Sequence, residues 1–175
     1  MSNYSHTTIR PLRADDIEPL LDWLAAPHVK AWWGTEDPQT SRLKYEERLA
    51  AEALTKVFII QVDHKPAGMI QCYRHCDYPD CDKEIAIDNA IGIDYLIAAP
   101  DLTNQGVGTQ AIKMMARMAL TLFPQLHTVV ASPHKDNIAS CRALEKAGFT
   151  FVREAKLASA FPAEGTSCIY EKRRQ

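Results

Sequence analysis

The sequence predicts an α/β fold, built as an α+β mixed sheet with helices packed against it. Short apolar segments alternate with longer segments in which apolar residues recur at helical spacing. The predicted order of elements is β-α-α-β-β-β-α-β-α-β-β. A turn with two glycines, Asn104-Gln105-Gly106-Val107-Gly108-Thr109, separates an apolar segment from an amphipathic helix. Together these observations favour a mixed sheet with helices against it.

The first part of the chain predicts one strand and two helices. Residues 7–12 have the composition of a strand, and residues 17–24 carry apolar side chains at helical spacing. Pro27 ends that first helix. Trp32-Trp33-Gly34 is expected in a loop rich in turn formers, and residues 41–54 are expected to form the second helix.

The middle of the chain predicts a hairpin and a further strand. The apolar segments 57–62 and 67–73 flank Asp63-His64-Lys65-Pro66, which is typical of a hairpin turn. Residues 76–89 are expected to form a long acidic loop. Residues 91–97 are apolar and predict the next strand.

The last part of the chain predicts two helices and three strands. Residues 106–122 follow the glycine turn as an amphipathic helix, and residues 128–131 form a β-branched strand. Asp136 or Asn137 begins the next helix, and Gly148 is a suitable residue to end it. The chain is then predicted to form its final strands at residues 149–152 and 168–170.

Length and composition narrow the classes of protein. A chain of 175 residues predicts one domain, residues 1–175. The apolar share of 46%, the charged share of 24% and the net charge of −2 are ordinary for a globular protein and give no general basis for nucleic-acid binding. No apolar run reaches the ~18 residues of a membrane span, and residues 1–8 lack a signal-peptide core. We therefore expect a cytoplasmic protein, either a monomer or a homodimer.

The five cysteines predict reduced thiols and no metal centre. Their number is odd and their spacing is irregular. Cys72, Cys76 and Cys81 lie near His75, but this spacing matches no common zinc pattern. No metal cofactor is expected.

The glycine turn predicts an anion-binding site. A helix start carries unpaired N–H groups and a positive dipole end, and glycine lets the backbone approach a phosphate closely. Thr109 stands where a Walker A motif needs Lys. The dinucleotide fingerprint needs an acidic residue about 20 positions on, and residues 128–131 supply none. The alternative is a helix that starts with glycine and binds nothing.

Two segments together resemble the GNAT-type acyl-CoA N-acetyltransferase superfamily. The glycine turn is similar to that superfamily's cofactor loop, and residues 137–149, with Asn first and Lys-Ala-Gly-Phe last, are similar to its second signature. Further residues are similar to bacterial aminoglycoside 6′-N-acetyltransferases; these are Trp32, Trp33, Gly34, Gln71, Tyr73, Gly92, Ile93, Asp94 and Pro133. The matches run from about Arg10 to Tyr170.

The resemblance implies a fold, a co-substrate and its binding residues. The central sheet would splay between its fourth and fifth strands, with helices on both faces. Acetyl-CoA would bind with its pyrophosphate on the glycine turn and its pantetheine arm in the splayed gap. The cofactor-binding residues would then be Leu96, Ile97, Asn104, Gln105, Gly106, Val107, Gly108, Thr109, Pro133 and Asn137.

Asp94 is the candidate general base. It lies in an otherwise apolar strand, where a carboxylate is costly unless it is paired or hydrogen-bonded, and a cationic amine would supply a partner. The alternative is an aspartate on the solvent face of the strand. Three positions depart from the related enzymes. Thr103 stands where relatives often carry Gln or Arg. Leu144 stands where many relatives carry a Tyr that acts as general acid, and Ser132 stands where some carry Asp.

The acidic segment predicts a cationic substrate. Between positions 77 and 94 the chain carries six carboxylates and a single Lys. A cleft lined by carboxylates would attract a polycation such as an aminoglycoside. The alternative is an ordinary solvated loop. The substrate-binding residues we expect are Trp32, Trp33, Gln71, Tyr73, Asp80, Asp82, Glu84, Asp94 and Ser132.

The leading hypothesis is therefore an enzyme that moves an acetyl group from acetyl-CoA to the 6′-amine of an aminoglycoside, by direct attack in a ternary complex. A second hypothesis is acetylation of another amine, such as a polyamine, a siderophore precursor or a protein N-terminus. A third is a non-catalytic sensor that binds acyl-CoA, which would keep the glycine turn and dispense with Asp94.

Overall fold

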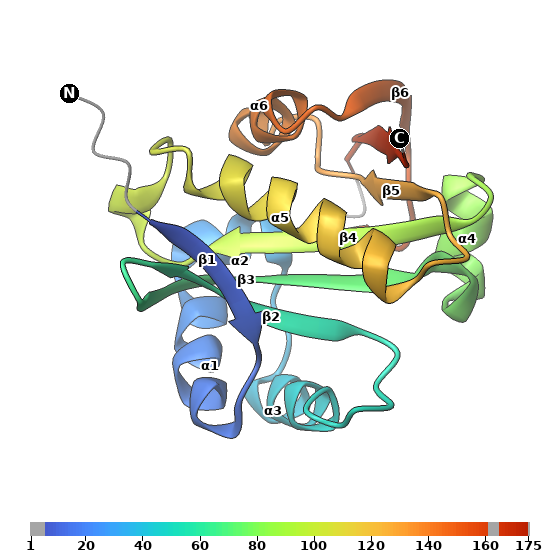
Figure 1. Ribbon diagram of the computed structural model, residues 1–175. Coiled ribbons are helices and arrows are strands. Elements are labelled where there is room, and N and C mark those ends of the chain that lie inside the picture. Colours follow the sequence, from blue (N-terminus) through green and yellow to red (C-terminus); the bar gives the residue numbers. More distant parts are fainter. Residues whose placement is uncertain (1–5, 161–164, 175) are drawn as a thin grey trace.

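The computed structural model describes residues 6–160 and 165–174, and within them a sheet of seven strands has helices on both faces (Figure 1). The strand order is β1-β2-β3-β4-β5-β7-β6. The strands are β1 (Thr7–Pro11), β2 (Lys56–Val62), β3 (Lys65–Arg74), β4 (Ala90–Ile97), β5 (Thr128–Ala131), β6 (Thr150–Ala155) and β7 (Ser167–Arg173). The α-helices are α1 (Ile17–Ala25), α2 (Pro27–Trp33), α3 (Pro38–Glu47), α4 (Pro79–Ile85), α5 (Val107–Leu122) and α6 (Ile138–Lys146).

The first four strands form an antiparallel meander. The predicted turn between β2 and β3 is confirmed, because Asp63 and His64 both have positive φ angles, as a tight two-residue hairpin requires. Within β3 and β4, Gln71 pairs directly with Asp94, and Tyr73 pairs with Gly92. This register places the residues that resemble an acetyltransferase site side by side.

The sheet opens between β4 and β5. These strands are parallel and pair only through Ala90 with Thr128, Ile91 with Val129 and Gly92 with Val130. From Ile93 onward β4 has no pairing with β5. The predicted splayed mixed sheet is therefore confirmed.

The two faces of β4 lie in two different hydrophobic cores. Ile91 and Ile93 are almost fully buried on the face covered by α5 and α6. Leu96 packs on the opposite face with side chains from α1, α2 and α3. The alternation of the strand therefore points neighbouring residues at opposite layers of the molecule.

Three predictions about helices were wrong. Trp32 and Trp33 end helix α2 instead of lying in a loop, and the acidic segment folds as α4 instead of a loop. The second predicted helix, 41–54, is α3 and ends at Glu47. Each of these helices has Pro in its first turn, where its missing N–H costs nothing. Pro27, which was predicted to end the first helix, also begins α2.

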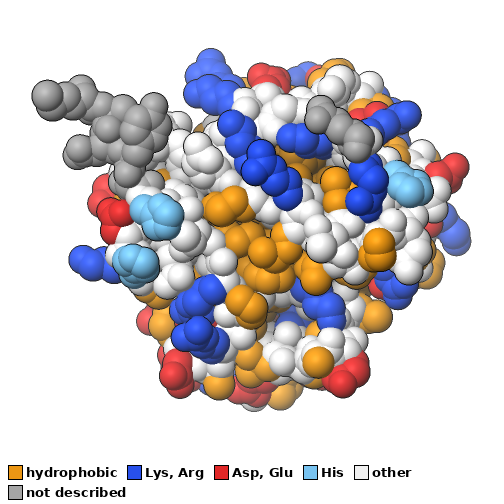
Figure 2. Space-filling view, in the orientation of Figure 1, with side chains coloured by type: hydrophobic (Ala, Val, Ile, Leu, Met, Phe, Trp, Pro, Cys, Tyr) orange, Lys and Arg blue, Asp and Glu red, His pale blue; other side chains and the backbone are white. Residues whose placement is uncertain are grey.

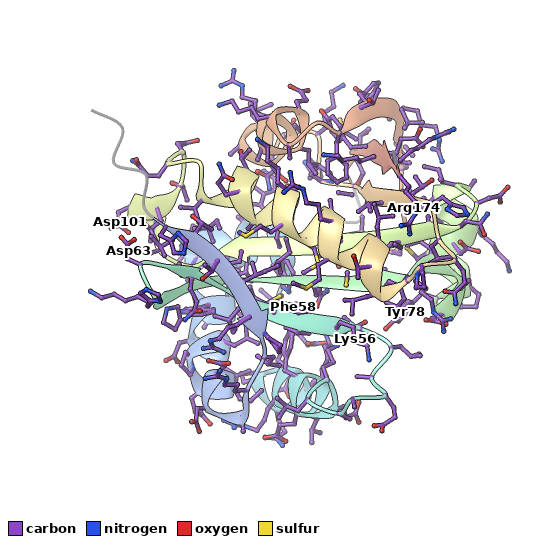
Figure 3. The ribbon with its side chains drawn as sticks, viewed as in Figure 1. Lys56, Phe58, Asp63, Tyr78, Asp101 and Arg174 are labelled. Carbon is purple, nitrogen blue, oxygen red and sulfur yellow. The ribbon has the colours of Figure 1, made fainter. Side chains whose placement is uncertain are left out.

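The two ends of α5 differ in their hydrogen bonding. At its C-terminal end, the Arg174 guanidinium donates hydrogen bonds to the carbonyl oxygens of Leu120 and Leu126 at 2.7 and 3.0 Å. In Figure 3, Arg174 and Tyr78 lie toward one end of the molecule, and Asp63 and Asp101 lie toward the other. Asp101 belongs to the short turn that precedes α5. The N-terminal end of α5 therefore lies opposite the end that Arg174 closes.

Candidate active site

The start of α5 offers a group of backbone N–H donors. The first hydrogen bond of helical spacing runs from the Gln110 amide to the Gly106 carbonyl, so the amides of Val107, Gly108 and Thr109 lie in the first turn. Gly106 has a φ of 83°, which favours glycine. A Cβ built on Gly106 or Gly108 would meet no atom within 4 Å. The turn is therefore open to an approaching anion.

The surroundings of this helix are basic. Helix α5 contains Lys113 and Arg117 and no acidic residue, and α6 contains Arg142 and Lys146. Figure 2 shows Lys and Arg side chains gathered over these two helices. Their charge adds to the helix dipole and favours binding of phosphate groups on this face.

A cavity of about 480 Å³ lies against the part of β4 that leaves β5. Helices α2 and α3, the segment around α4 and the start of α6 contribute its walls. It contains many of the residues that the sequence singled out, namely Trp32, Trp33, Gln71, Tyr73, Asp94, Ser132, Pro133 and Asn137. The fold therefore brings together residues from five separate segments of the chain.

Asp94 is held in a chain of hydrogen bonds. Gln71 donates from Nε2 to Asp94 Oδ2 at 2.9 Å and accepts from Arg48 Nη1 at 2.9 Å. Burial raises the pKa of the Asp94 carboxyl above its ordinary value, while Gln71, Tyr73 and the charge of Arg48 lower that pKa in part. Asp94 thus lies on the floor of a cleft, and the alternative of a solvent-facing strand residue is wrong.

Gly92 makes room for the aromatic wall of the cavity. A Cβ at this position would lie 2.5 Å from Cζ of Tyr73 and 2.7 Å from Nε2 of His75. The Tyr73 ring also meets Tyr78 edge-on at 5.2 Å, and Tyr78 shares a 2.6 Å hydrogen bond with Thr55. Any side chain at Gly92 would displace these rings from beside Asp94.

The two tryptophans have different surroundings. Trp32 is 39% exposed, and its ring centre lies 5.7 Å from that of His134 across the cavity mouth. Trp33 packs partly against the core of α1, α2 and α3. Helix α2 therefore places one flat aromatic face toward solvent and anchors itself with the other.

The wall opposite Asp94 comes from the start of α6. Asn137 is the N-cap of this helix, and its Oδ1 accepts from the Ser140 amide at 3.3 Å. The Tyr95 hydroxyl and Ser140 Oγ lie 2.5 Å apart. Because its oxygen is used in the cap, Asn137 has its amide N–H groups to offer to a ligand.

Leu96 and Ile97 lie at the far end of β4. The Leu96 side chain is buried toward α1–α3. The Ile97 carbonyl oxygen lies 3.3 Å from Nε2 of His28. The Ile97 side chain packs partly against the core on the opposite face, and neither residue belongs to the cavity wall.

The carboxylates of α4 do not line the cavity. Asp80 is exposed, and neither Asp80 nor Asp82 belongs to the cavity wall. Glu84 instead accepts from the amides of Ala158 and Ser159 at 2.7 and 3.2 Å. Among the described residues, Asp94 is the one carboxylate of the wall, and it is accompanied by Lys44 and Arg48.

Lys44, Arg48 and Tyr95 are among the wall residues that the sequence analysis missed. Lys44 and Arg48 lie at the end of α3, and Tyr95 follows Asp94 on β4. Lys44 is paired with Glu36 at 2.6 Å, whereas Arg48 bonds to the neutral amide of Gln71. No spacing in the sequence joins α3 to β4, so only the fold reveals these contacts.

The fold, with its sheet open between β4 and β5, is that of an acetyltransferase. A family model described as an acetyltransferase (GNAT) domain matches residues 13–157, so the chain belongs to the GNAT acetyltransferase family. It is 28% identical over 148 residues to aminoglycoside N(6′)-acetyltransferase type 1 of Klebsiella pneumoniae, covering 81% of this chain and 73% of that protein. The protein of the same name from Serratia marcescens matches equally well.

Solved structures share the fold over nearly the whole chain. A crystal structure of the aminoglycoside acetyltransferase AAC(6′)-Ib with coenzyme A has a TM-score of 0.83 at 24% identity, covering 97% of this chain and 96% of that one. A structure of AAC(6′)-Ib with coenzyme A and kanamycin has the same TM-score at 23% identity and the same coverage. An aminoglycoside N(6′)-acetyltransferase of Legionella pneumophila has a TM-score of 0.70 at 19% identity, covering 95% and 91%.

The described residues show neither a helix that could span a membrane nor a cluster of metal-binding side chains. Residues 6–160 and 165–174 contain no helix long and apolar enough to cross a membrane. In the same residues, no three His, Cys, Asp or Glu side chains are grouped so that they could hold a metal ion.

Proposed function

We propose that this protein transfers an acetyl group from acetyl-CoA to the 6′-amine of an aminoglycoside, in the cytoplasm and by direct attack in a ternary complex. One observation carries this proposal. Asp94 lies in a cleft at the point where β4 leaves β5, aromatic side chains form part of the same wall, and the open start of α5 follows the end of β4 in the chain. This is the arrangement that a base needs between a CoA thioester and an amine.

The residues of the donor side fit acetyl-CoA. The open amides of Gly106 to Thr109 suit a pyrophosphate, with Asn104 and Gln105 at the edge of the turn. The pantetheine arm would run through the opening between β4 and β5, along the backbone of Leu96 and Ile97 and past Pro133 and Asn137. Bound there, acetyl-CoA supplies an activated thioester.

Asp94 would act on the amine. An aliphatic amine is protonated at neutral pH and must lose a proton before it attacks. A carboxylate with an ordinary pKa is a weak base for this purpose, and burial raises the pKa of Asp94 in the useful direction. Gln71 orients the carboxylate, because its donated hydrogen bond fixes Oδ2 and leaves Oδ1 for the amine.

The acceptor side suits a sugar that carries amines. Trp32, Trp33 and Tyr73 provide flat faces against which a sugar ring can pack, and Ser132 provides a hydroxyl at the rim. Asp80 and Asp82 would act through their field on an approaching polycation and not by contact. Glu84 would contribute less, because its oxygens are engaged by residues 158–159.

One observation favours a second candidate. Arg48 and Lys44 line the cleft, and the Arg48 guanidinium has a neutral partner, Gln71. A substrate with a carboxylate near its amine, such as an amino-acid-derived siderophore precursor, could pair with that guanidinium. Such a substrate would use the same base and the same donor site.

A thiol-release assay tests the proposal. The protein is incubated with acetyl-CoA and with kanamycin, tobramycin, spermine, lysine or a basic peptide in turn, and free CoA thiol is measured. Thiol release with the two antibiotics, and a mass increase of one acetyl group on the 6′-nitrogen, is the expected result. Release with lysine alone favours the second candidate and rejects the first. Binding of CoA without release from any amine rejects both and favours a sensor.

A further inference from the structure

Asp94 and Tyr95 approach the cavity from opposite faces of the sheet. They are neighbours on β4, so the pleat points their side chains in opposite directions. Asp94 faces Gln71 and Arg48, whereas Tyr95 packs against the core formed with α5 and α6. Both side chains nevertheless line the same cavity. They can do so because β4 has already separated from β5 at this point.

The Tyr95 hydroxyl reaches across the opening to α6. It lies 2.5 Å from Ser140 Oγ and 3.4 Å from the Ser140 carbonyl oxygen. The O–H of Tyr95 therefore lies on the side of the opening from which the CoA arm would enter, and Asp94 lies on the side of the amine. In acyl transfer, the amine and the thiolate are on different sides of the reacting carbon.

We propose that Tyr95, hydrogen-bonded to Ser140, is the general acid that protonates the departing CoA thiolate. This inference rests on the proposed function, because it assumes that a thioester is bound in the opening. The neutral amine nitrogen forms a bond to the carbonyl carbon, whose π pair moves to oxygen, and gives a proton to Asp94, which has already passed the earlier ammonium proton to water. The C–S bond then breaks, and its electron pair stays on sulfur. Tyr95 transfers its O–H proton to that sulfur, and its oxygen regains a proton from water by way of the Ser140 hydroxyl.

The protonation states suit this role. Burial raises the pKa of Tyr95 well above that of a free tyrosine, so the phenol keeps its proton at neutral pH. A CoA thiolate released beside Tyr95 would be the acceptor of that proton. Ser140 is half-buried, which gives it access to solvent water.

Other proton donors near α6 are poorly placed. Leu144 has no proton to donate and is fully buried. Cys141 is buried outside the cavity wall, with its Sγ 4.0 Å from the His134 carbonyl oxygen. The His134 ring accepts from the Asp136 amide at Nδ1, and its Nε2 abuts the backbone of Gly165. Tyr95 is the wall residue whose acidic proton lies at the opening itself.

The experiment compares three variants that each lose one oxygen. Tyr95→Phe removes the acid and keeps the ring, and Ser140→Ala removes the relay. Tyr170→Phe is the matched control, since its buried hydroxyl bonds to Glu145 away from the cavity. For each variant we would measure kcat, the KM for acetyl-CoA, the Kd for CoA and the solvent deuterium isotope effect on kcat. Hydrolysis of acetyl-CoA without amine is measured in parallel, because it expels the same thiolate.

We expect Tyr95→Phe to lower kcat by roughly 100-fold or more and to reduce the isotope effect, with KM and Kd within about 2-fold of the parent values. Ser140→Ala should lower kcat by roughly 10-fold or less, and Tyr170→Phe should leave it unchanged. An unchanged kcat in Tyr95→Phe, or a change in Kd alone, overturns the assignment. If the parent protein acetylates none of the aminoglycosides, the proposed function fails, and the hydrolysis rates still decide whether Tyr95 is the acid.

Discussion

The proposed donor end and the acceptor cleft are built from different chemical groups: the first from backbone amides and the second from side chains. At the proposed donor end, the binding surface would be made by backbone amides of one continuous segment, residues 104–109. In the acceptor cleft, side chains from α2, α3, β3, β4 and the start of α6 converge. A backbone site is local and leaves a short motif in the sequence, whereas a side-chain site is assembled from distant segments and leaves none.

The charge of the acceptor cleft illustrates this difference. The acidic segment predicts a carboxylate-lined cleft, yet α4 directs Glu84 to the amides of residues 158–159 and leaves Asp80 exposed. The charges that do reach the cleft beside Asp94 are Lys44 and Arg48. The number of acidic residues in a segment therefore does not predict the electrostatic potential inside the cleft, because their side chains do not line it. Variants of Asp94 and Gly108 should separate the two regions by their effects on kcat and on CoA binding.

The largest expected effect is that of Asp94→Asn. Loss of the base should lower kcat by roughly 100- to 10,000-fold. The Kd for CoA, measured by calorimetry, should stay within about 2-fold, because the amide replaces the carboxylate on the acceptor side. Asp88→Asn is the control, an exposed acid of the same stretch that lies outside the cavity wall. Equal losses in both variants would contradict a specific role for Asp94.

The raised pKa of Asp94 predicts the direction in which activity and stability change with pH. Burial raises the pKa of Asp94, so the base is lost as pH falls through a value above the ~3.9 of a free aspartate. A folded-state pKa above the unfolded one also means that the ionised group destabilises the fold at neutral pH and that this loss is relieved on acidification. Asp94→Asn should therefore have a higher Tm than the parent at pH 7, and the difference should shrink as the pH falls.

Gly108→Glu should act on the donor end alone. A carboxylate at the start of α5 would repel the pyrophosphate and weaken CoA binding by roughly 10- to 100-fold, while its interaction with the helix dipole should not harm stability. The matched variant is Gly108→Ala, since a Cβ at this position meets nothing within 4 Å. Calorimetric titration with CoA measures both. Full binding by Gly108→Glu would remove the start of α5 from the donor site.

Arg48→Gln should distinguish a polycationic substrate from an amine that also carries a carboxylate. Removing the positive charge should lower the KM for a polycationic aminoglycoside by about 2- to 5-fold. For an amine that also carries a carboxylate, the KM should rise instead. Arg42→Gln is the control, because Arg42 lies on the same helix and pairs with Glu18 at 2.6 Å. The direction of the change in KM distinguishes the two classes of substrate.

The smallest effect is expected from Glu84→Gln. Its carboxylate is bonded to the Ala158 and Ser159 amides, so the KM for kanamycin should stay within about 2-fold while Tm falls by about 1–3 °C. Hydrogen bonds from Ser159 lower the pKa of Glu84. The stabilisation is therefore present at neutral pH and is lost as the pH falls through this lowered pKa. A large rise in KM would restore Glu84 to the substrate site.

Much of the scaffold was predictable because its signals are local. The strand β5 was predicted at its observed bounds, residues 128–131, and α5 was predicted to within one residue. Asn137 begins α6 as predicted. The errors lie at α2, at the end of α3 and at α4; Pro27 follows the end of α1 as predicted but also begins α2, and Pro79 begins α4 inside the predicted loop. A proline can begin a helix or end one, and the packing of the following residues decides which.

By itself the sequence determined the mixed sheet, the glycine turn that begins α5 and the candidacy of Asp94, because strand alternation, glycine turns and helix caps depend on neighbours in the chain. Only the tertiary structure decided what surrounds Asp94. The pairing of β3 with β4 brings Gln71 to it, and the end of α3 adds Arg48. The separation of β4 from β5 lets Tyr95 reach Ser140 in the same cavity. These contacts join residues that are far apart in sequence, so no local pattern could encode them.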